Sequence, residues 1–407
     1  MSGSDILSPN SIGNQTVAAV PEQFGIYIHI PYCLQRCTYC DFATYVHTEI
    51  IPSDKYVELV KKEMGLGKKF FEPRKLDTLY FGGGTPSLIP AEQITGLIQE
   101  IKKHDFIVTP HAEITIEINP ATVDERKLNH YLEHGVNRFS VGAQSFSDRL
   151  LKMVHREHSA KQTLETLNLL ESYKLNYSFD LLFALPTQTM AELEHDLEVT
   201  LSMGMSHVSP YCLTVPEGHP LSKNRPFDVE QVEMFELIHK KLLGKNFHRY
   251  EISNYAQPGK ESRHNLLYWT DQPYWGLGLS AHSYAKKSSW GTRFWNASHV
   301  SIYEKTILAA TEATHTNFTD DNSETLEYHQ SLTDFCYTSL RLEKGLSLAG
   351  LIAKFGPKAA EKIELLARPL VDQGLMKFMQ NSWSLTDKGV FISNQIYEKF
   401  TFLKSDF

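Results

Sequence analysis

Three of the five cysteines of this chain lie close together, at Cys33, Cys37 and Cys40. A thiolate is a strong ligand for iron and zinc, so three thiols with this spacing indicate a metal site. An iron–sulfur cluster is usually held by four cysteines, and three would leave one iron with a free coordination position. The spacing therefore favours an iron–sulfur cluster at which chemistry takes place.

Zinc and ordinary buried cysteines are the alternatives. A structural zinc site needs a fourth nitrogen or sulfur ligand, commonly in a second cysteine pair. Neither Cys212 nor Cys336 lies in a Cys-x2-Cys pair. Both stand in apolar surroundings, where we expect small core side chains.

The composition describes a globular protein. The chain has 407 residues, of which 42% are hydrophobic and 22% are charged, and this length predicts two domains. The net charge is −8, and we find no cluster of basic residues of the kind that binds nucleic acid. Residues 1–22 contain neither a basic n-region nor an apolar h-region, so we expect a flexible tail and a cytoplasmic location. We predict no membrane span, and peripheral contact with a membrane stays open.

Short β-branched or aromatic runs alternate with helical patterns along the first half of the chain. The alternation predicts six βα units and a parallel sheet, with the site at the carboxyl ends of the strands. The predicted helices include residues 54–65, 91–103 and 160–173. The predicted strands cover residues 26–30, 76–81, 113–118, 137–141, 177–185 and 207–213.

The last part of the chain changes character. Helical patterns over residues 326–342, 348–355 and 358–373 are followed by two short strand-like runs near Leu375 and Trp383. Helices followed by a hairpin are typical of a winged-helix module. Because the charge is balanced here, we expect this module to dock against the first domain or against a protein, and not to bind DNA.

A glycine-rich run follows the second predicted strand at Gly82-Gly83-Gly84-Thr85. Glycines permit positive φ and close backbone approach, so this run predicts either a ligand cradle or a tight turn. Glu117 ends the third predicted strand, where a buried carboxylate needs a partner.

The cysteine motif, with Tyr39 before its last cysteine, resembles the signature of the radical S-adenosylmethionine (SAM) superfamily. The resemblance implies a partial (β/α)6 barrel and a [4Fe-4S] cluster on Cys33, Cys37 and Cys40, with SAM on the fourth iron. It also implies which residues contact SAM, and these are Tyr27, Tyr39, Gly83, Gly84, Thr85, Glu117, Gln144, Arg156 and Asp180. One departure is that Ala184 and Thr187 stand where the superfamily usually has glycine.

Within the superfamily the chain resembles the oxygen-independent coproporphyrinogen III oxidase-like branch, from about residue 24 to residue 399. True oxidases have a fourth cysteine where this chain has Phe42. The run His264-Asn265-Leu-Leu-Tyr268-Trp269 resembles the heme-associated motif of the HemW-type heme chaperones. This likeness implies that heme is the cargo and that a hemoprotein receives it.

His264 has two interpretations. A neutral imidazole is a good axial ligand for heme iron, and Tyr268 and Trp269 offer flat surface for a porphyrin. A histidine beside aromatic side chains can equally form a hydrogen-bonded structural element. The resemblance favours a position near heme without assigning the iron ligand.

The sequence thus predicts a flexible tail (1–22), a radical SAM partial barrel (23–255), a connecting segment (256–323) and a mainly helical, winged-helix-like domain (324–407). The predicted function is that of a heme chaperone with a [4Fe-4S] cluster and SAM. The alternatives are a SAM-dependent coproporphyrinogen III oxidase and a radical enzyme that opens or methylates heme.

Overall fold

The computed structural model describes residues 22–67, 71–72, 74–286, 288, 290–311 and 322–407. The tail expected over residues 1–22 lies, apart from Glu22, outside the described residues. No helix in the described ranges is long and apolar enough to cross a membrane.

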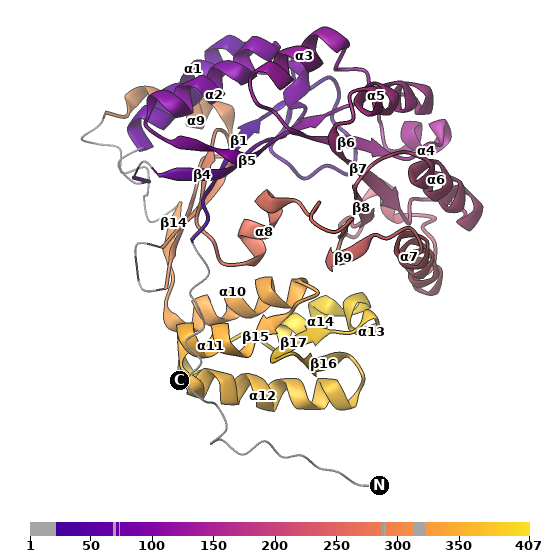
Figure 1. Cartoon of the computed structure of the whole chain (residues 1–407), viewed down its shortest axis with the longest axis vertical. Coiled ribbons are helices and arrows are strands. Elements are labelled where there is room, and N and C mark those ends of the chain that lie inside the picture. Colours follow the sequence, from indigo (N-terminus) through magenta and orange to yellow (C-terminus); the bar gives the residue numbers. More distant parts are fainter. Residues whose placement is uncertain (1–21, 68–70, 73, 287, 289, 312–321) are drawn as a thin grey trace.

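Six parallel strands form the centre of the first domain and follow one another in chain order (Figure 1). Each strand pairs in parallel with the next. The predicted strands are confirmed, although β5 begins well before the expected residue 113. The strands are β1 (Gly25–Ile30), β4 (Lys75–Gly83), β5 (Ile107–Ile118), β6 (Arg138–Gln144), β7 (Asn176–Phe183) and β8 (His207–Cys212).

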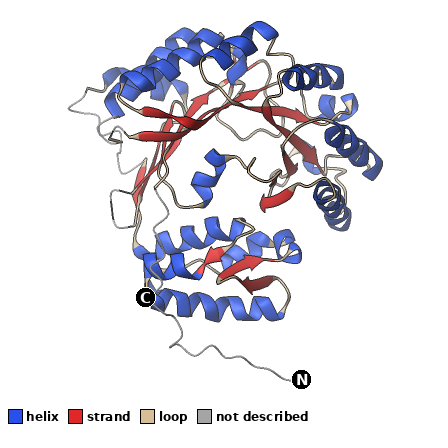
Figure 2. Cartoon of the chain, in the orientation of Figure 1, coloured by secondary structure: helices blue, strands red, loops and turns tan. Residues whose placement is uncertain are grey.

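Helices between these strands, and one after the last of them, cover the convex face of the sheet, as Figures 1 and 2 show. Several begin at capping residues: the Ser159 hydroxyl accepts a bond from the Gln162 backbone, and Thr189 does the same for Glu192. The helices are α1 (Ser53–Gly67), α2 (Ala91–Lys103), α3 (Glu125–Glu133), α4 (Asp148–Met153), α5 (Ala160–Ser172), α6 (Met190–Ser202) and α7 (Asp228–Leu243).

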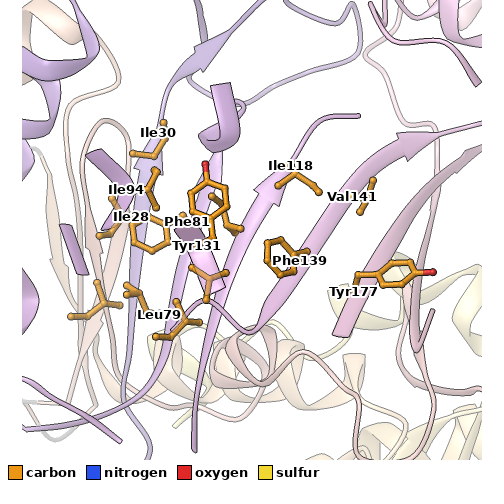
Figure 3. Close-up of a cluster of buried hydrophobic side chains, with 14 of the residues drawn as sticks. Ile28, Ile30, Leu79, Phe81, Ile94, Ile118, Tyr131, Phe139, Val141 and Tyr177 are labelled. Carbon is orange, nitrogen blue, oxygen red and sulfur yellow. The ribbon is translucent and has the colours of Figure 1, made fainter. Parts of the chain in front are cut away.

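The main core lies between the sheet and these helices. Side chains of β1, β4, β5, β6 and β7 pack with Ile94 of α2 and Tyr131 of α3 (Figure 3). Because side chains alternate between the two faces of a strand, the neighbours of the core residues point to the concave face. Along β1, Ile28 and Ile30 enter the core, whereas Tyr27 and His29 line a cavity. The alternation therefore directs polar side chains of β1 toward the cavity on the concave face.

Further strands extend the sheet at both edges. Beside β1 lie β11 (Tyr274–Leu277), β12 (His282–Ala285), β13 (Thr292–Trp295) and β14 (Ser323–Thr325), and beside β8 lie β10 (Asn254–Ala256) and β9 (His248–Glu251). The predicted connecting segment thus contributes strands to the sheet. Between β10 and β11 the chain crosses the concave face as α8 (Arg263–Trp269), and α9 (Val300–Ala309) contacts α1.

The last part of the chain forms a second hydrophobic core, which includes the fully buried Cys336, as expected. The same expectation is wrong for Cys212, which is exposed because it ends β8 at the edge of the core. Three helices precede an antiparallel hairpin, the order predicted for this region. The elements are α10 (Tyr328–Arg341), β15 (Leu346–Ser347), α11 (Leu348–Phe355), α12 (Pro357–Asp372), β16 (Met376–Met379), β17 (Ser382–Leu385), α13 (Asp387–Phe391) and α14 (Ser393–Glu398).

Candidate functional site

A cavity of about 840 Å³ lies on the concave side of the sheet. Its walls come from β1, β4 and β5, from the cysteine loop, from α8, from strands β11 to β13 and from α10 of the C-terminal part. The cavity opens at the carboxyl ends of the parallel strands, where ligands of open α/β sheets bind. It brings together part of the predicted site, namely Tyr27, Gly83, Glu117, His264, Asn265, Tyr268 and Trp269. The three cysteines and the predicted SAM residues Tyr39, Gly84, Thr85, Gln144, Arg156 and Asp180 do not line it.

The cysteine loop follows β1 and is held by two short parallel strands, β2 (Tyr32–Cys33) and β3 (Tyr45–Val46). The His47 backbone donates to the Cys33 carbonyl at 2.8 Å, and the Cys40 backbone donates to the Cys37 carbonyl at 3.2 Å. All three thiols are free and half-buried. The structure thus places the three predicted ligands in one compact loop.

The spacing of the sulfurs tests which metal fits. Among the described residues, the one group of three His, Cys, Asp or Glu side chains with ligand atoms within 4.8 Å of one another is His130, Glu133 and His134 on α3. At least one pair of sulfurs in the cysteine loop is therefore further apart. Thiolates on a single tetrahedral zinc, at about 2.3 Å each, lie about 3.8 Å apart. At least one sulfur would therefore have to move before the three thiolates could bind a single zinc ion.

The thiols also need a positive partner. Burial raises the pKa of the Cys33 thiol to about 11, and it raises the pKa of Cys40 as well. A thiolate is the metal ligand, so a cationic centre is what would stabilise the ionised form of these buried thiols. The donor set therefore fits an iron–sulfur cluster.

The glycine loop lies directly against the cysteine loop. The Gly84 backbone donates to the Ile30 carbonyl at 2.9 Å, and the Thr85 backbone donates to the Tyr32 carbonyl at 2.7 Å. Gly83 has φ +111°, and a Cβ there would come within 2.5 Å of the His29 ring. The glycines are thus required by close packing of the two loops, and Gly83 also lines the cavity.

Glu117 ties the glycine loop to the sheet. Its carboxylate accepts from the Tyr80 hydroxyl at 2.8 Å and from the Gly83 backbone at 3.1 Å. Burial raises the pKa of Glu117 to about 7, although both bonds lower it. The carboxyl group lines the cavity and can exchange a proton near neutral pH.

Arg156 is a half-buried cation beside the cysteine loop. One guanidinium nitrogen lies 3.5 Å from the Cys37 sulfur, and the other donates to the Asn119 side chain at 2.5 Å and to the Gly142 carbonyl. Its Nε is buried without a hydrogen-bond partner. A buried unpaired donor is costly, so this group fits an anionic ligand such as a carboxylate.

The other predicted SAM residues lie around this cation. Gln144 ends β6 with φ +70°, close to Gly142. Burial raises the pKa of Asp180 to about 6, while Ser209, Arg138 and Arg156 lower it. Tyr39 packs against the apolar cluster that contains Leu150 and Val154.

The loop after β7 keeps an unusual backbone despite its side chains. Ala184 has φ +58° and Thr187 has φ +56°, in the left-handed region that glycine adopts most readily. Arg149 donates to the Thr187 hydroxyl at 2.8 Å and so supports this conformation. The loop therefore retains the backbone of a glycine-containing turn.

Helix α8 carries the four residues predicted to lie near heme. Ser262 caps its N-terminus, and Asn265, Tyr268 and Trp269 line the cavity. His264 lies at the cavity wall, but both ring nitrogens are engaged: Nδ1 with the Thr78 hydroxyl at 2.7 Å and Nε2 with the Tyr268 hydroxyl at 2.8 Å. Burial lowers the pKa of His264 to about 3. The imidazole is neutral and fixed in place.

Several cavity residues were not predicted as site residues. They include His29 and Tyr80 on the central strands, His282 and Arg293 beyond β11, and Phe335 on α10. The signal that could have found the first two was the alternation of side chains along each strand. No local pattern pointed to α10, because this helix reaches the cavity only through the packing of the two domains.

Comparison with known proteins agrees with this geometry. The radical SAM superfamily profile matches residues 27–199, and the HemN C-terminal domain profile matches residues 329–392. The heme chaperone HemW of Bacillus subtilis is 31% identical over 383 residues, which cover 92% of this chain and 98% of that protein. The chain belongs to the HemW family of the radical SAM superfamily.

Other members of the HemW family show similar likeness. HemW of Lactococcus lactis is 33% identical over 388 residues, covering 92% of this chain and 96% of that protein. The solved structure of coproporphyrinogen III oxidase (HemN) from Escherichia coli, described as a radical SAM enzyme, has a TM-score of 0.78 at 20% identity. It covers 93% of this chain and 90% of that chain, which confirms the predicted fold. Membership of the superfamily implies a [4Fe-4S] cluster and SAM.

Proposed function

We propose that this protein is a heme chaperone, which binds heme in the cavity between the sheet and α10 and delivers it to a hemoprotein. The observation that carries the proposal is the cavity itself, about 840 Å³ with aromatic walls, in a chain of the HemW family. Relatives named as heme chaperones align over most of the chain, which supports the same role here.

The aromatic side chains suit a flat, apolar cargo. Tyr268 and Trp269 of α8, Tyr274 and Tyr284 of the added strands and Phe335 of α10 all line the cavity. Aromatic rings gain from offset stacking and edge contacts with another planar ring system. The volume falls within the range of about 300–1,000 Å³ typical of small-molecule sites. A porphyrin is therefore a suitable occupant.

In the cysteine loop, whose residues Asp41, Phe42 and Ala43 line the cavity, Cys33, Cys37 and Cys40 would hold the cluster. SAM would lie over the glycine loop, with its carboxylate toward Arg156 and near Glu117, Gln144 and Asp180. The unpartnered Nε of Arg156 supports this orientation. When bound, the cluster supplies electrons and an open iron for SAM. Free thiols of this kind require a reducing compartment, and we place the protein in the cytoplasm.

The decisive experiment compares two substrates anaerobically with the reconstituted full chain. A chaperone binds heme with a stoichiometry near one and passes it intact to an apo-hemoprotein, without consuming SAM in proportion. The same preparation should release no carbon dioxide from coproporphyrinogen III above background. Catalytic release of carbon dioxide would identify an oxidase instead, and loss of the heme absorption bands would identify a heme-modifying enzyme.

A further inference from the structure

Three histidines line the cavity, and their ring nitrogens differ in availability. His29 is buried, with Nδ1 bonded to the Tyr27 hydroxyl at 3.0 Å and Nε2 bonded to the Ala43 carbonyl at 2.9 Å. His264 is likewise bonded at both nitrogens. Neither histidine can approach an iron atom without losing a buried hydrogen bond.

His282 is different. Its side chain is exposed, and among the described residues neither ring nitrogen has a hydrogen-bond partner. The ring stacks on Trp295 of β13, with centroids 5.7 Å apart and planes inclined by 23°. The stacking holds the ring in one orientation while both nitrogens remain available to a ligand in the cavity.

Several other possible donors for heme iron are less suitable. Heme iron is held by histidine, cysteine, methionine or tyrosine, and no cysteine or methionine of the described residues lines the cavity. The hydroxyl groups of Tyr80 and Tyr284 donate to Glu117 and Asp271. Burial raises the pKa of Tyr274 to about 12, so its phenol stays protonated.

A buried network positions the turn before His282. The Glu63 carboxylate accepts from the Gly278 backbone at 2.8 Å, from the Tyr303 hydroxyl at 2.6 Å and from the Asn296 side chain at 2.6 Å. Asn296 also donates to the Gly278 carbonyl at 2.7 Å. Within the turn, Gly278 and Ser280 adopt φ +88° and +55°. The start of β12 is thus fixed from three elements, which suits a preorganised ligand.

We propose that His282 is the axial ligand of the heme iron, and that His264 is a positioning residue that fixes Tyr268 in the wall of the cavity. This inference rests on the proposed heme-binding function and adds the donor atom to it. His264, which the sequence places near heme, remains in the cavity wall, but the iron is bound by a different element, at the start of β12.

The test is titration of ferric heme into the anaerobic full chain, followed by absorption and electron paramagnetic resonance. His282→Ala should change the ligation spectrum and weaken binding at least about tenfold. Added imidazole should restore the spectrum of this variant, because it can occupy the vacated space. The heme spectrum of His264→Ala should show the same type of iron ligation as that of the wild type. His195→Ala, an exposed histidine on α6 outside the cavity, serves as the matched control.

The outcomes separate the two proposals. Heme binding by the wild type with an unaltered spectrum in His282→Ala would overturn the ligand assignment and leave the chaperone proposal standing. Loss of the wild-type spectrum in His264→Ala, with imidazole rescue there, would assign the iron to His264. Absence of heme binding by the wild type would overturn both proposals.

Discussion

At the scale of single residues, Cys33, Cys37 and Cys40 are separated from the other two cysteines by environment. The first three share one half-buried loop at the cavity, whereas Cys336 is buried in the C-terminal core and Cys212 is exposed at the end of β8. All five cysteines are free thiols, so their position in the fold and their exposure distinguish the metal ligands from the ordinary cysteines.

We expect the anaerobically reconstituted protein to hold about four irons per chain. The triple change Cys33→Ser, Cys37→Ser and Cys40→Ser should abolish iron and labile sulfide, as measured by chemical analysis and by the visible absorption of the cluster. Cys212→Ser and Cys336→Ser are the controls and should retain both. A cluster that persists in the triple variant would contradict the assignment.

Arg156 provides a second prediction at this scale. Arg156→Ala should weaken SAM binding by about 1.5–3 kcal/mol, because a buried charged hydrogen bond to an anion is lost. Calorimetry on the reconstituted protein measures the affinity, and iron content shows whether the cluster remains. Arg126→Ala is the matched control, since this exposed guanidinium lies near Glu92 outside the cavity. Equal SAM affinity in both variants would make Arg156 a structural residue.

At the scale of elements, the turn between β11 and β12 depends on a carboxyl group that comes from helix α1. Burial raises the pKa of Glu63 to about 7, and the hydrogen bonds from Tyr303, Gly278 and Asn296 offset part of this effect. The folded-state pKa lies above the usual value of 4.5, so folding favours the protonated form. The contribution of Glu63 to the free energy of unfolding is therefore present below about pH 4.5 and is lost as the pH rises to about 7.

Glu63→Gln should remove this dependence, because an amide does not ionise. Between pH 4.5 and 7 the unfolding free energy of the wild type should fall by about 3 kcal/mol relative to that of the variant. Chemical denaturation at several pH values measures the difference, and Glu165→Gln, on the exposed face of α5, is the control. Parallel pH profiles for wild type and Glu63→Gln would show that Glu63 does not change its protonation on folding.

At the scale of the whole molecule, the C-terminal domain closes the cavity through charged contacts with the barrel. Each pair joins residues far apart in the sequence, and the pairs are Arg249–Asp387 at 2.7 Å, Lys354–Asp271 at 2.8 Å, Arg293–Asp334 at 2.9 Å and Arg341–Glu251 at 3.2 Å. The Arg341 guanidinium also lies 4.4 Å from the centre of the Trp269 ring. Helix α10, which ends at Arg341, therefore positions Trp269, an aromatic residue in the wall of the proposed heme site.

Arg341→Ala should destabilise the protein by about 3 kcal/mol, because the fully buried Glu251 carboxylate would lose its cationic partner. It should also lower heme affinity, since Trp269 loses the guanidinium that packs on its ring. Denaturation midpoints and heme titration measure the two effects. Arg368→Ala, an exposed residue paired with Glu364 on α12, should change stability by less than about 0.5 kcal/mol. Similar stability of the two variants would contradict the role given to the Arg341 contact.

Much of this architecture could be predicted from the sequence because it depends on near neighbours along the chain. The spacing of Cys33, Cys37 and Cys40 identified the metal loop, and the β-branched and aromatic run at residues 26–30 identified the first strand. The glycine run after β4 could also be recognised in the sequence, but the contact that requires a glycine at Gly83 could not. The close approach of the His29 ring to Gly83 joins two strands that meet only in the sheet.

The sequence by itself thus determined the fold class, the family and the loop that would hold the cluster. Only the tertiary structure decided which histidine is free to bind iron. His264 bonds to Thr78, which lies 186 residues away, and the turn before His282 is held by Glu63, 215 residues before Gly278. The burial and hydrogen-bond partners of a side chain depend on elements brought together by folding. A local motif can therefore place a residue near a ligand, but the packing of remote elements determines which of its atoms remain available.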